Sequence, residues 1–394
     1  MLNKKMLELG TASSAIRQLF EYGKTRKAEI GEDKVFDFSI GNPSVPAPKN
    51  VDETIKRLID TTDSVLLHGY TSAAGDMEVR SKIANYIKET SGVQASASNI
   101  YMTCGAAASL TITLNALANE GDEVILLAPF FPEYRVFAEK AGFKCVVVNC
   151  REPDFQIDVS ALENAITEKT KAIIINSPNN PTGVVFSEET IIELSGLLNK
   201  KQQEYKKDIF LISDEPYREL VYGDVSVPYP QKYYNNTIVC YSFSKSLSLP
   251  GERIGYIYVS PNCNQSALVF AAVCGAGRAL GFVCAPSMLQ RVVAENLGKT
   301  ADVSVYNKNR ELLYKALTDY GYTAVKPDGA FYLFVKSPEA DANAFAEKAK
   351  KYELLLVPSD SFGMGGYVRI SYCVSTKQIE NSLSAFKKLI EEYK

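Results

Sequence analysis

Short apolar runs alternate with longer helical patterns through the middle of the chain, and this alternation limits the possible folds more than any other feature. The runs are rich in Val, Ile and Leu, which is typical of buried parallel strands. They are Glu123–Leu127, Lys144–Val148, Ala172–Ile175, Ile209–Ile212 and Thr237–Tyr241. Helical patterns at 132–141, 158–167 and 187–202 separate most of them. Repeated strand–helix–strand units of this kind predict an α/β fold with a mostly parallel, doubly wound central sheet.

The pattern changes from about residue 299, where a long polar helix begins. Short strands are expected around 329–335, 354–357 and 367–371, and a closing helix near 375–392. This order predicts a separate, smaller α+β domain onto which the N-terminal segment packs. We place the large domain at 50–290. The N-terminal arm and the small C-terminal domain then take 1–49 and 291–394.

Charge and composition favour a small-molecule partner. The 43 basic and 46 acidic residues are dispersed and leave a net charge of -3, so no basic surface for nucleic acid or an anionic membrane is expected. Residues 1–8 lack the apolar core of a signal peptide, and no apolar run is long enough to span a bilayer. We therefore expect a cytoplasmic protein without nucleic-acid or membrane partners.

The chain has a single histidine, His68, which excludes a histidine-based metal cluster. No metal is expected, and proton transfer must fall mainly to Lys, Asp, Glu, Tyr or Cys. The eight cysteines are scattered without a C-x-x-C pair, as expected of reduced thiols.

Polar segments follow three of the predicted strands, at the sheet edge where α/β proteins bind ligands. Residues 176–183 read NSPNNPTG, residues 213–217 read SDEPY, and residues 242–256 read SFSKSLSLPGERIGY. Each segment alone has an ordinary interpretation as a turn, a helix cap or solvated surface. Together they bring an amine, a carboxylate, amide and phenol donors and a phosphate clamp to one edge.

In residue type, order and spacing, these segments resemble the fold-type I pyridoxal-phosphate (PLP) enzymes, aminotransferase class I and II, across nearly the whole chain. The resemblance implies the aspartate aminotransferase-like fold and pyridoxal 5'-phosphate as cofactor. Lys245 would hold the cofactor as a Schiff base and carry the proton, since only a primary amine makes an exchangeable imine. Asp214 would pair with the pyridine nitrogen. Asn180 and Tyr217 match positions that hydrogen-bond the ring 3' oxygen.

The resemblance also assigns the rest of the cofactor site. Gly105, Ala106 and Ala107 open a helix after a short strand and match the phosphate loop, where helix N–H groups suit an anion. Phe131 matches the aromatic residue stacked on the ring, unless it is core and Phe130 or Tyr134 lies nearer. The remaining cofactor-binding positions are Ser242, Ser244 and Arg253, and Tyr70, which would reach the phosphate from the neighbouring subunit of a homodimer with shared sites.

Arg369 interrupts an apolar strand, which is costly unless a carboxylate pairs with it. The family uses this position, with Asn180, to bind the substrate α-carboxylate, and Gly41 would let the backbone approach the same group. The alternative is a structural salt bridge. One subgroup binds a distal carboxylate through a lysine where this chain has Ala107, and another through an arginine that aligns near Arg278 of the adjacent subunit. Arg17 is a second candidate.

The expected reaction is amino transfer between an L-amino acid and a 2-oxo acid such as 2-oxoglutarate, with aspartate as the first donor to try. Three alternatives stay open. They are an aminotransferase for alanine or other neutral or aromatic amino acids, a PLP-dependent C–S β-lyase, and a binding module without activity. Intact Lys245, Asp214, Tyr217 and Arg369 argue for turnover and against the binding module.

Overall fold

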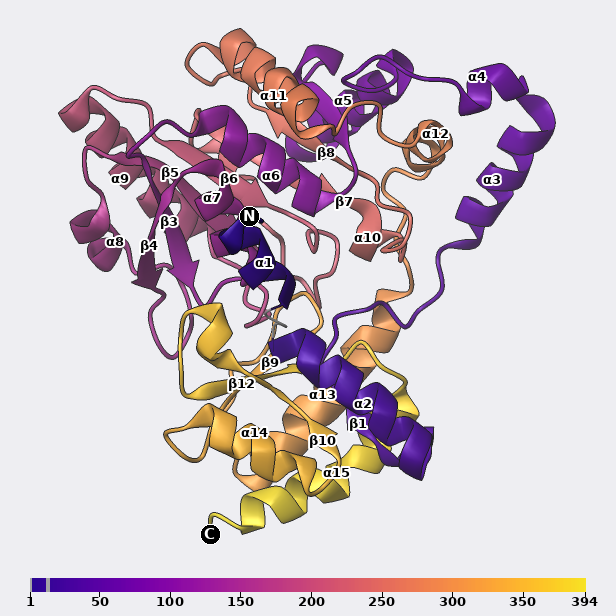
Figure 1. Cartoon of the computed structure of the whole chain (residues 1–394), viewed down its shortest axis with the longest axis vertical. Coiled ribbons are helices and arrows are strands. Elements are labelled where there is room, and N and C mark those ends of the chain that lie inside the picture. The colour runs from indigo at the N-terminus through magenta and orange to yellow at the C-terminus, as the bar shows by residue number, and fades with distance from the viewer. Residues whose placement is uncertain (1, 12–14) are drawn as a thin grey trace.

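The structure is a computed structural model that describes residues 2–11 and 15–394, and its centre is a seven-stranded sheet (Figure 1). From one edge to the other the strands are β2 (Ile100–Thr103), β8 (Gly255–Val259), β7 (Thr237–Ser242), β6 (Phe210–Asp214), β5 (Thr170–Asn176), β3 (Glu123–Ala128) and β4 (Lys144–Asn149). Strands β7, β6, β5, β3 and β4 run parallel, and β8 is antiparallel to both of its neighbours. The predicted α/β fold with a mostly parallel sheet is confirmed.

Two features of the sheet differ from the sequence prediction. Strand β8 was not predicted as a strand, although it lies between β2 and β7. Strand β4 is not a buried strand. It forms the edge of the sheet with β3 as its only neighbour among the described strands, so Val148 is its only buried residue and the other five are partly buried or exposed.

Helices cover both faces of this sheet. The helices of this part are α5 (Met77–Ser91), α6 (Ala106–Leu117), α7 (Glu133–Ala141), α8 (Val159–Ala165), α9 (Glu188–Tyr205), α10 (Phe243–Ser246), α11 (Ser266–Leu280) and α12 (Ser287–Glu295). Helix α6 packs on α7, α11 and the middle of the sheet. Helix α5 packs on β2 and α12, and its apolar side chains join a separate hydrophobic core.

The sequence marks several helix ends with capping residues. Asp76 accepts hydrogen bonds from Glu78 N and Val79 N at the start of α5, and Gly92 follows that helix in the left-handed conformation. Ser187 caps α9 in the same way.

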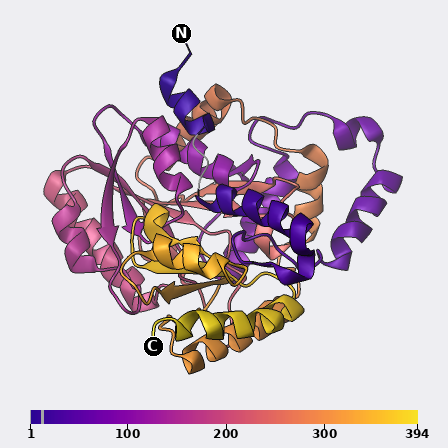
Figure 2. The ribbon, with the colours of Figure 1, turned by 60° about the horizontal axis from the view of Figure 1, so that its bottom comes forward.

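The C-terminal part forms a smaller layer below the large sheet (Figures 1 and 2). A three-stranded antiparallel sheet has the order β11 (Val357–Pro358), β12 (Tyr367–Ser371) and β9 (Tyr332–Lys336). Helices α13 (Val303–Tyr320), α14 (Ala342–Lys350) and α15 (Thr376–Glu391) cover it.

The N-terminal segment joins this smaller part. After α1 (Lys4–Thr11), helix α2 (Ala15–Ile30) packs on β11, and β1 (Phe36–Asp37) pairs in parallel with β10 (Leu354–Leu355). Phe38 lies in the same hydrophobic core as Phe386, with ring centroids 5.8 Å apart. The predicted bounds near residues 50 and 290 stay a prediction.

Helices α3 (Lys49–Thr61) and α4 (Ser64–His68) project from one side of the molecule (Figure 1). Large apolar side chains on and after them face solvent, among them Val65 at 81% exposure and Met77 at 62%. An exposed group of this kind is typical of a protein–protein interface.

No helix in the described ranges is long and apolar enough to cross a membrane. All eight cysteines are free thiols.

Candidate functional site

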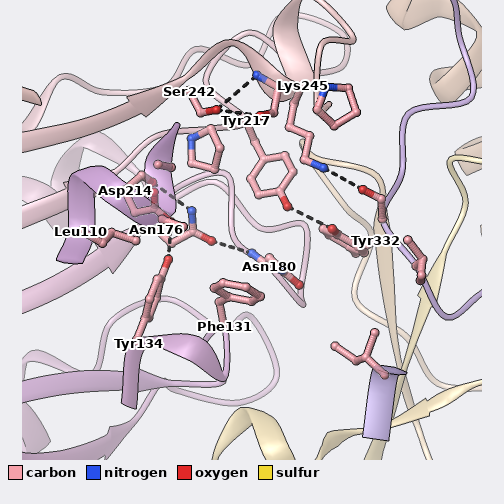
Figure 3. Close-up of a pocket in the computed structure, with 18 of the residues that line it drawn as sticks. Leu110, Phe131, Tyr134, Asn176, Asn180, Asp214, Tyr217, Ser242, Lys245 and Tyr332 are labelled. Carbon is pink, nitrogen blue, oxygen red and sulfur yellow. Dashed lines mark hydrogen bonds between the residues drawn. The ribbon is translucent and has the colours of Figure 1, made fainter. Parts of the chain in front are cut away.

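A cavity of about 340 Å³ lies at the carboxyl ends of β5, β6 and β7, against the smaller part of the molecule (Figure 3). Most of the predicted site residues line it. They are Gly41, Ala106, Ala107, Phe131, Asn180, Asp214, Tyr217, Ser242, Ser244, Lys245, Arg253 and Arg369. Further lining residues include Ile16, Ile40, Leu110, Tyr134, Asn176 and Tyr332. The segments that were chosen for their chemistry therefore converge in one cavity.

Lys245 lies on the short helix that directly follows β7, and its Nζ donates a hydrogen bond to the Gly41 carbonyl at 2.7 Å. Burial lowers the pKa of Lys245 to about 8, and the positive charges of Arg253 and Arg369 act in the same direction. About a tenth of this amine is therefore neutral at pH 7. A neutral amine can act as a nucleophile and as a base.

Asp214 ends β6 and is buried, with 4% of its surface exposed. Its Oδ2 accepts a hydrogen bond from the Tyr134 hydroxyl (Figure 3), and its Oδ1 has no hydrogen-bond partner in the described part of the chain. Burial raises the pKa of Asp214 to about 7, although the bond from Tyr134 lowers it. Such a carboxyl group is suited to a cationic partner that enters the cavity.

Asn176 fixes the loop that carries Asn180 (Figure 3). Its Nδ2 donates to the backbone carbonyl of Asp214 at 2.9 Å, and its Oδ1 accepts from the backbone N–H of Asn180 at 2.8 Å. The ends of β5 and β6 are thereby held together. Asn180 in turn accepts a hydrogen bond from Arg369 on its Oδ1 at 3.1 Å.

The start of α6 forms an anion cradle with Arg253. Gly105 is the N-cap of α6 with φ +88°, and no described side chain caps the helix. Arg253 Nη1 donates to Ser244 Oγ at 3.3 Å and to the Pro250 carbonyl at 2.9 Å. A Cβ on Gly105 would lie 2.8 Å from Arg253 Nη2, so the close approach requires glycine. Free helix N–H groups beside a guanidinium suit a phosphate.

Arg369 lies on β12 with only 2% of its surface exposed. Besides Asn180 it donates to the Ser39 carbonyl, and its guanidinium carbon lies 4.6 Å from the Tyr332 ring centroid and 5.2 Å from that of Phe362. No carboxylate pairs with it in the described part of the chain, and its Nε has no partner there. The alternative of a structural salt bridge is therefore wrong for these residues. A buried cation without an anion is unfavourable, and an anionic ligand would remove the cost.

Four predicted positions do not line the cavity. Gly105 lies directly beside it, against Arg253. Tyr70 is 98% exposed, and Arg278 is exposed near the end of α11. Arg17 is also exposed and follows Ile16, which does line the cavity. The roles of Tyr70 and Arg278 depend on a second copy of the chain and stay predictions.

The structure sets Phe130 apart from the other two aromatic candidates. Phe131 lines the cavity and packs edge-on against Tyr134, with ring centroids 5.7 Å apart. Phe130 is buried in the hydrophobic core instead. Tyr134 also lines the cavity, but its hydroxyl group donates a hydrogen bond to Asp214.

Sequence reasoning did not assign a role to Asn176 or Tyr332, and gave Tyr134 only as an alternative ring neighbour. Asn176 is the first residue of the polar segment 176–183, so its amide could have been recognised there as a candidate. Tyr332 stood within a predicted strand, and nothing in its local sequence set it apart from core residues.

Three comparisons with known proteins bear on this site. A sequence model of the family "Aminotransferase class I and II" matches residues 33–386. A protein named "Probable aspartate aminotransferase" from Methanocaldococcus jannaschii is 31% identical over 96% of this chain and 97% of its own length. A protein named "Aromatic-amino-acid aminotransferase 2" from Thermococcus litoralis is 29% identical over 97% of this chain and 96% of its own. A crystal structure of an amino transferase from Eubacterium rectale is 55% identical, with a TM-score of 0.98 over 100% of this chain and 99% of that one.

Proposed function

Because the chain belongs to the aminotransferase class I and II family, we propose that it moves the amino group of an L-amino acid to a 2-oxo acid such as 2-oxoglutarate. Aspartate is the first donor in this proposal. Alanine and neutral or aromatic amino acids are the alternatives, and both kinds of name occur among its relatives.

The cavity fits pyridoxal 5'-phosphate at three points. Asp214 leaves one buried carboxylate oxygen without a partner among the described residues, which suits a protonated ring nitrogen. The α6 start with Ser242, Ser244 and Arg253 suits the phosphate. Lys245 suits the aldehyde because burial lowers its pKa. When bound, the cofactor supplies an aldehyde that exchanges amines and a ring that takes up electrons.

Four residues around the cofactor would have separate roles in the reaction. Lys245 would take the proton from the substrate Cα and deliver it to the aldehyde carbon of the bound cofactor, as its pKa of about 8 allows near neutral pH. Asn180 and Tyr217 orient the ring oxygen through their amide and phenol donors. Phe131 covers the ring and limits the access of water.

Arg369 carries this proposal, because it is a buried guanidinium with no carboxylate partner in the described part of the chain. Its two hydrogen bonds go to neutral oxygens, those of Asn180 and Ser39, so its charge is uncompensated. A substrate α-carboxylate would supply the missing negative charge and accept bonds from a planar, preorganised donor.

The choice of aspartate requires one more cation. Among the described residues, only Lys245, Arg253 and Arg369 bring a positive charge to the cavity wall, and each already has a role. A distal carboxylate would therefore pair with Arg278 of a second copy, or with Arg17 beside Ile16. Without such a pair, the apolar wall formed by Ile16, Ile40 and Leu110 favours a neutral side chain.

We infer that two copies form a homodimer with shared sites. The exposed apolar side chains on and after α3 and α4 include Ile59, Val65, Leu66, Tyr70 and Met77. A second copy would bury this surface and bring Tyr70 to its neighbour's phosphate cradle.

Absorption spectroscopy of the purified protein with its cofactor tests this function. L-Aspartate, L-alanine and L-phenylalanine are added separately, followed by 2-oxoglutarate. We expect aspartate to bleach the visible band of the lysine-bound cofactor and 2-oxoglutarate to restore it. Lys245→Ala should lack that band, whereas the exposed control Lys144→Ala should keep it.

Each other outcome identifies a different error. A band that responds only to alanine or phenylalanine would retain amino transfer and reject aspartate. Pyruvate and ammonia from cystathionine, formed without any oxo acid, would indicate the β-lyase. No visible band in the wild-type protein would reject the cofactor and with it the proposed function.

A further inference from the structure

We propose that Tyr332 is a positioning residue that connects the carboxylate clamp Arg369 to the phenol of Tyr217. This inference rests on the proposed function. Tyr332 does not belong to any segment from which the site was predicted, yet it lines the cavity and its hydroxyl faces that of Tyr217 (Figure 3).

Strand register places Tyr332 beside Arg369. In the antiparallel pair of β9 and β12, Tyr332 is opposite Ser371 and Phe334 is opposite Arg369. Tyr332 and Arg369 are therefore diagonal neighbours that point to the same side of the sheet. The guanidinium lies over the Tyr332 ring at 4.6 Å, in a setting from which solvent is excluded. Such a cation–π contact fixes the plane in which Arg369 presents its donors.

The other end of Tyr332 reaches the phenol network. Its hydroxyl lies 3.0 Å from that of Tyr217, and both residues are buried. A phenol has only one proton to donate. If Tyr217 gives its proton to a ring oxygen of the cofactor, it must accept the proton of Tyr332. Burial raises the pKa of Tyr332 to about 12, so this donor keeps its proton at working pH.

Gly41 shows how closely this arrangement is packed. A Cβ at residue 41 would lie 2.0 Å from Tyr332 Oη, so any larger residue would displace the tyrosine. The carbonyl of Gly41 also accepts the hydrogen bond from Lys245 Nζ. Tyr332 thus packs against Gly41, whose carbonyl binds Lys245, as well as against Arg369 and Tyr217.

The ring and the hydroxyl of Tyr332 should have separable effects. The ring orders Arg369, so its loss should weaken the binding of the substrate carboxylate. The hydroxyl donates to Tyr217, so its loss should slow turnover and change the titration of the lysine-bound cofactor, with little effect on carboxylate binding.

Two variants separate these effects in the protein loaded with cofactor. For Tyr332→Phe we expect an approximately fivefold lower kcat from one lost hydrogen bond, a KM within about twofold of wild type since the ring is kept, and a raised pH midpoint of the visible band. For Tyr332→Leu we also expect about tenfold weaker binding of succinate, measured calorimetrically, from the lost cation–π contact. The control is Tyr322→Phe. The Tyr322 hydroxyl is buried and donates a hydrogen bond of 2.8 Å to the Phe386 carbonyl, and Tyr322 does not line the cavity.

The outcomes are distinguishable from failure of the proposed function. If wild type shows the band and turns over, but Tyr332→Phe matches it in kcat and pH midpoint, the inference is overturned alone. Equal losses in Tyr332→Phe and Tyr322→Phe would also overturn it, because they would indicate a general packing defect. If Tyr332→Leu does not fold, the comparison of Tyr332→Phe with Tyr322→Phe still tests the role of the Tyr332 hydroxyl.

Discussion

At the scale of single residues, Asp214 combines two demands that oppose each other. Its site keeps a carboxyl group away from water, which raises its pKa to about 7, while Tyr134 supplies one hydrogen bond that favours the ionised form. Burial of this carboxyl group therefore lowers the unfolding free energy of the cofactor-free protein. The difference between 3.8 and about 7 corresponds to about 4 kcal/mol of unfolding free energy.

Asp214→Asn should therefore stabilise the cofactor-free protein in alkaline solution. The raised folded pKa means that the stability contributed by Asp214 is complete below about pH 4 and is lost as the pH rises through about 7. The unfolding free energy of the variant should exceed that of wild type by up to about 4 kcal/mol at pH 8, and by little at pH 4. Urea unfolding at several pH values measures this, with the exposed Asp33→Asn as control. A constant difference across the pH range would contradict the argument.

The sequence predicts residues whose chemistry is visible in their own segment. Lys245 and Asp214 were assigned because the order and spacing of their segments resemble the family, and Arg369 also because a guanidinium interrupts an apolar strand. Tyr332 has no such mark, because its importance comes from a neighbouring strand. The roles of all site residues stay predictions until they are tested.

At the scale of elements, the start of α6 shows why its first turn needs a glycine. Gly105 has φ +88°, and its missing side chain leaves room for Arg253. Gly121, on the loop after the same helix, has φ +87° with no atom within 4 Å of an added Cβ. The two glycines share a positive φ and differ in what an added Cβ would contact.

Gly105→Ala should weaken binding of the cofactor at least tenfold, a loss of more than about 1.4 kcal/mol. Gly121→Ala should bind it as wild type does, and both variants should lose about 1–3 kcal/mol of stability because alanine is strained at a positive φ. Calorimetric titration with pyridoxal 5'-phosphate and thermal unfolding measure the two effects. Equal affinities of the two variants would show that the contact with Arg253 is unimportant.

The elements themselves were largely predictable, because the five runs in the middle of the chain are long enough to show their period. Strand β8 was missed because it begins at Gly255, within a segment whose polar residues already had a proposed role. The exposure of β4 could not be predicted either, since an edge strand differs from a central one only in its neighbours.

At the scale of the whole molecule, the cavity wall comes from both parts of the chain. The large sheet supplies Asp214 and the short helix after β7 supplies Lys245. The small sheet supplies Arg369 and Tyr332, and the N-terminal segment supplies Gly41. The change in the strand and helix pattern along the sequence separated these parts, but it could not show which of their surfaces are in contact. That information lies in contacts such as the hydrogen bond from Arg369 to Ser39.

Two inactive variants should restore activity when they are combined, if the site is shared between copies. Tyr70→Ala and Lys245→Ala would damage the same site from different subunits. Half of the dimers in an equal mixture contain one chain of each kind, and each mixed dimer has one intact site. Co-expression should therefore recover about a quarter of the wild-type specific activity. Mixed dimers that form without any recovery would place both residues in one subunit's site.

The tyrosines of the cavity also have an optical consequence. The chain contains 23 tyrosines and no tryptophan, so its ultraviolet emission comes from phenol rings. Tyr134, Tyr217 and Tyr332 line the cavity. A coloured molecule that enters it will receive excitation from these rings and quench their emission. The unlabelled protein should therefore report the filling of its own site by a loss of fluorescence, without the tryptophan background that obscures such a signal in most enzymes.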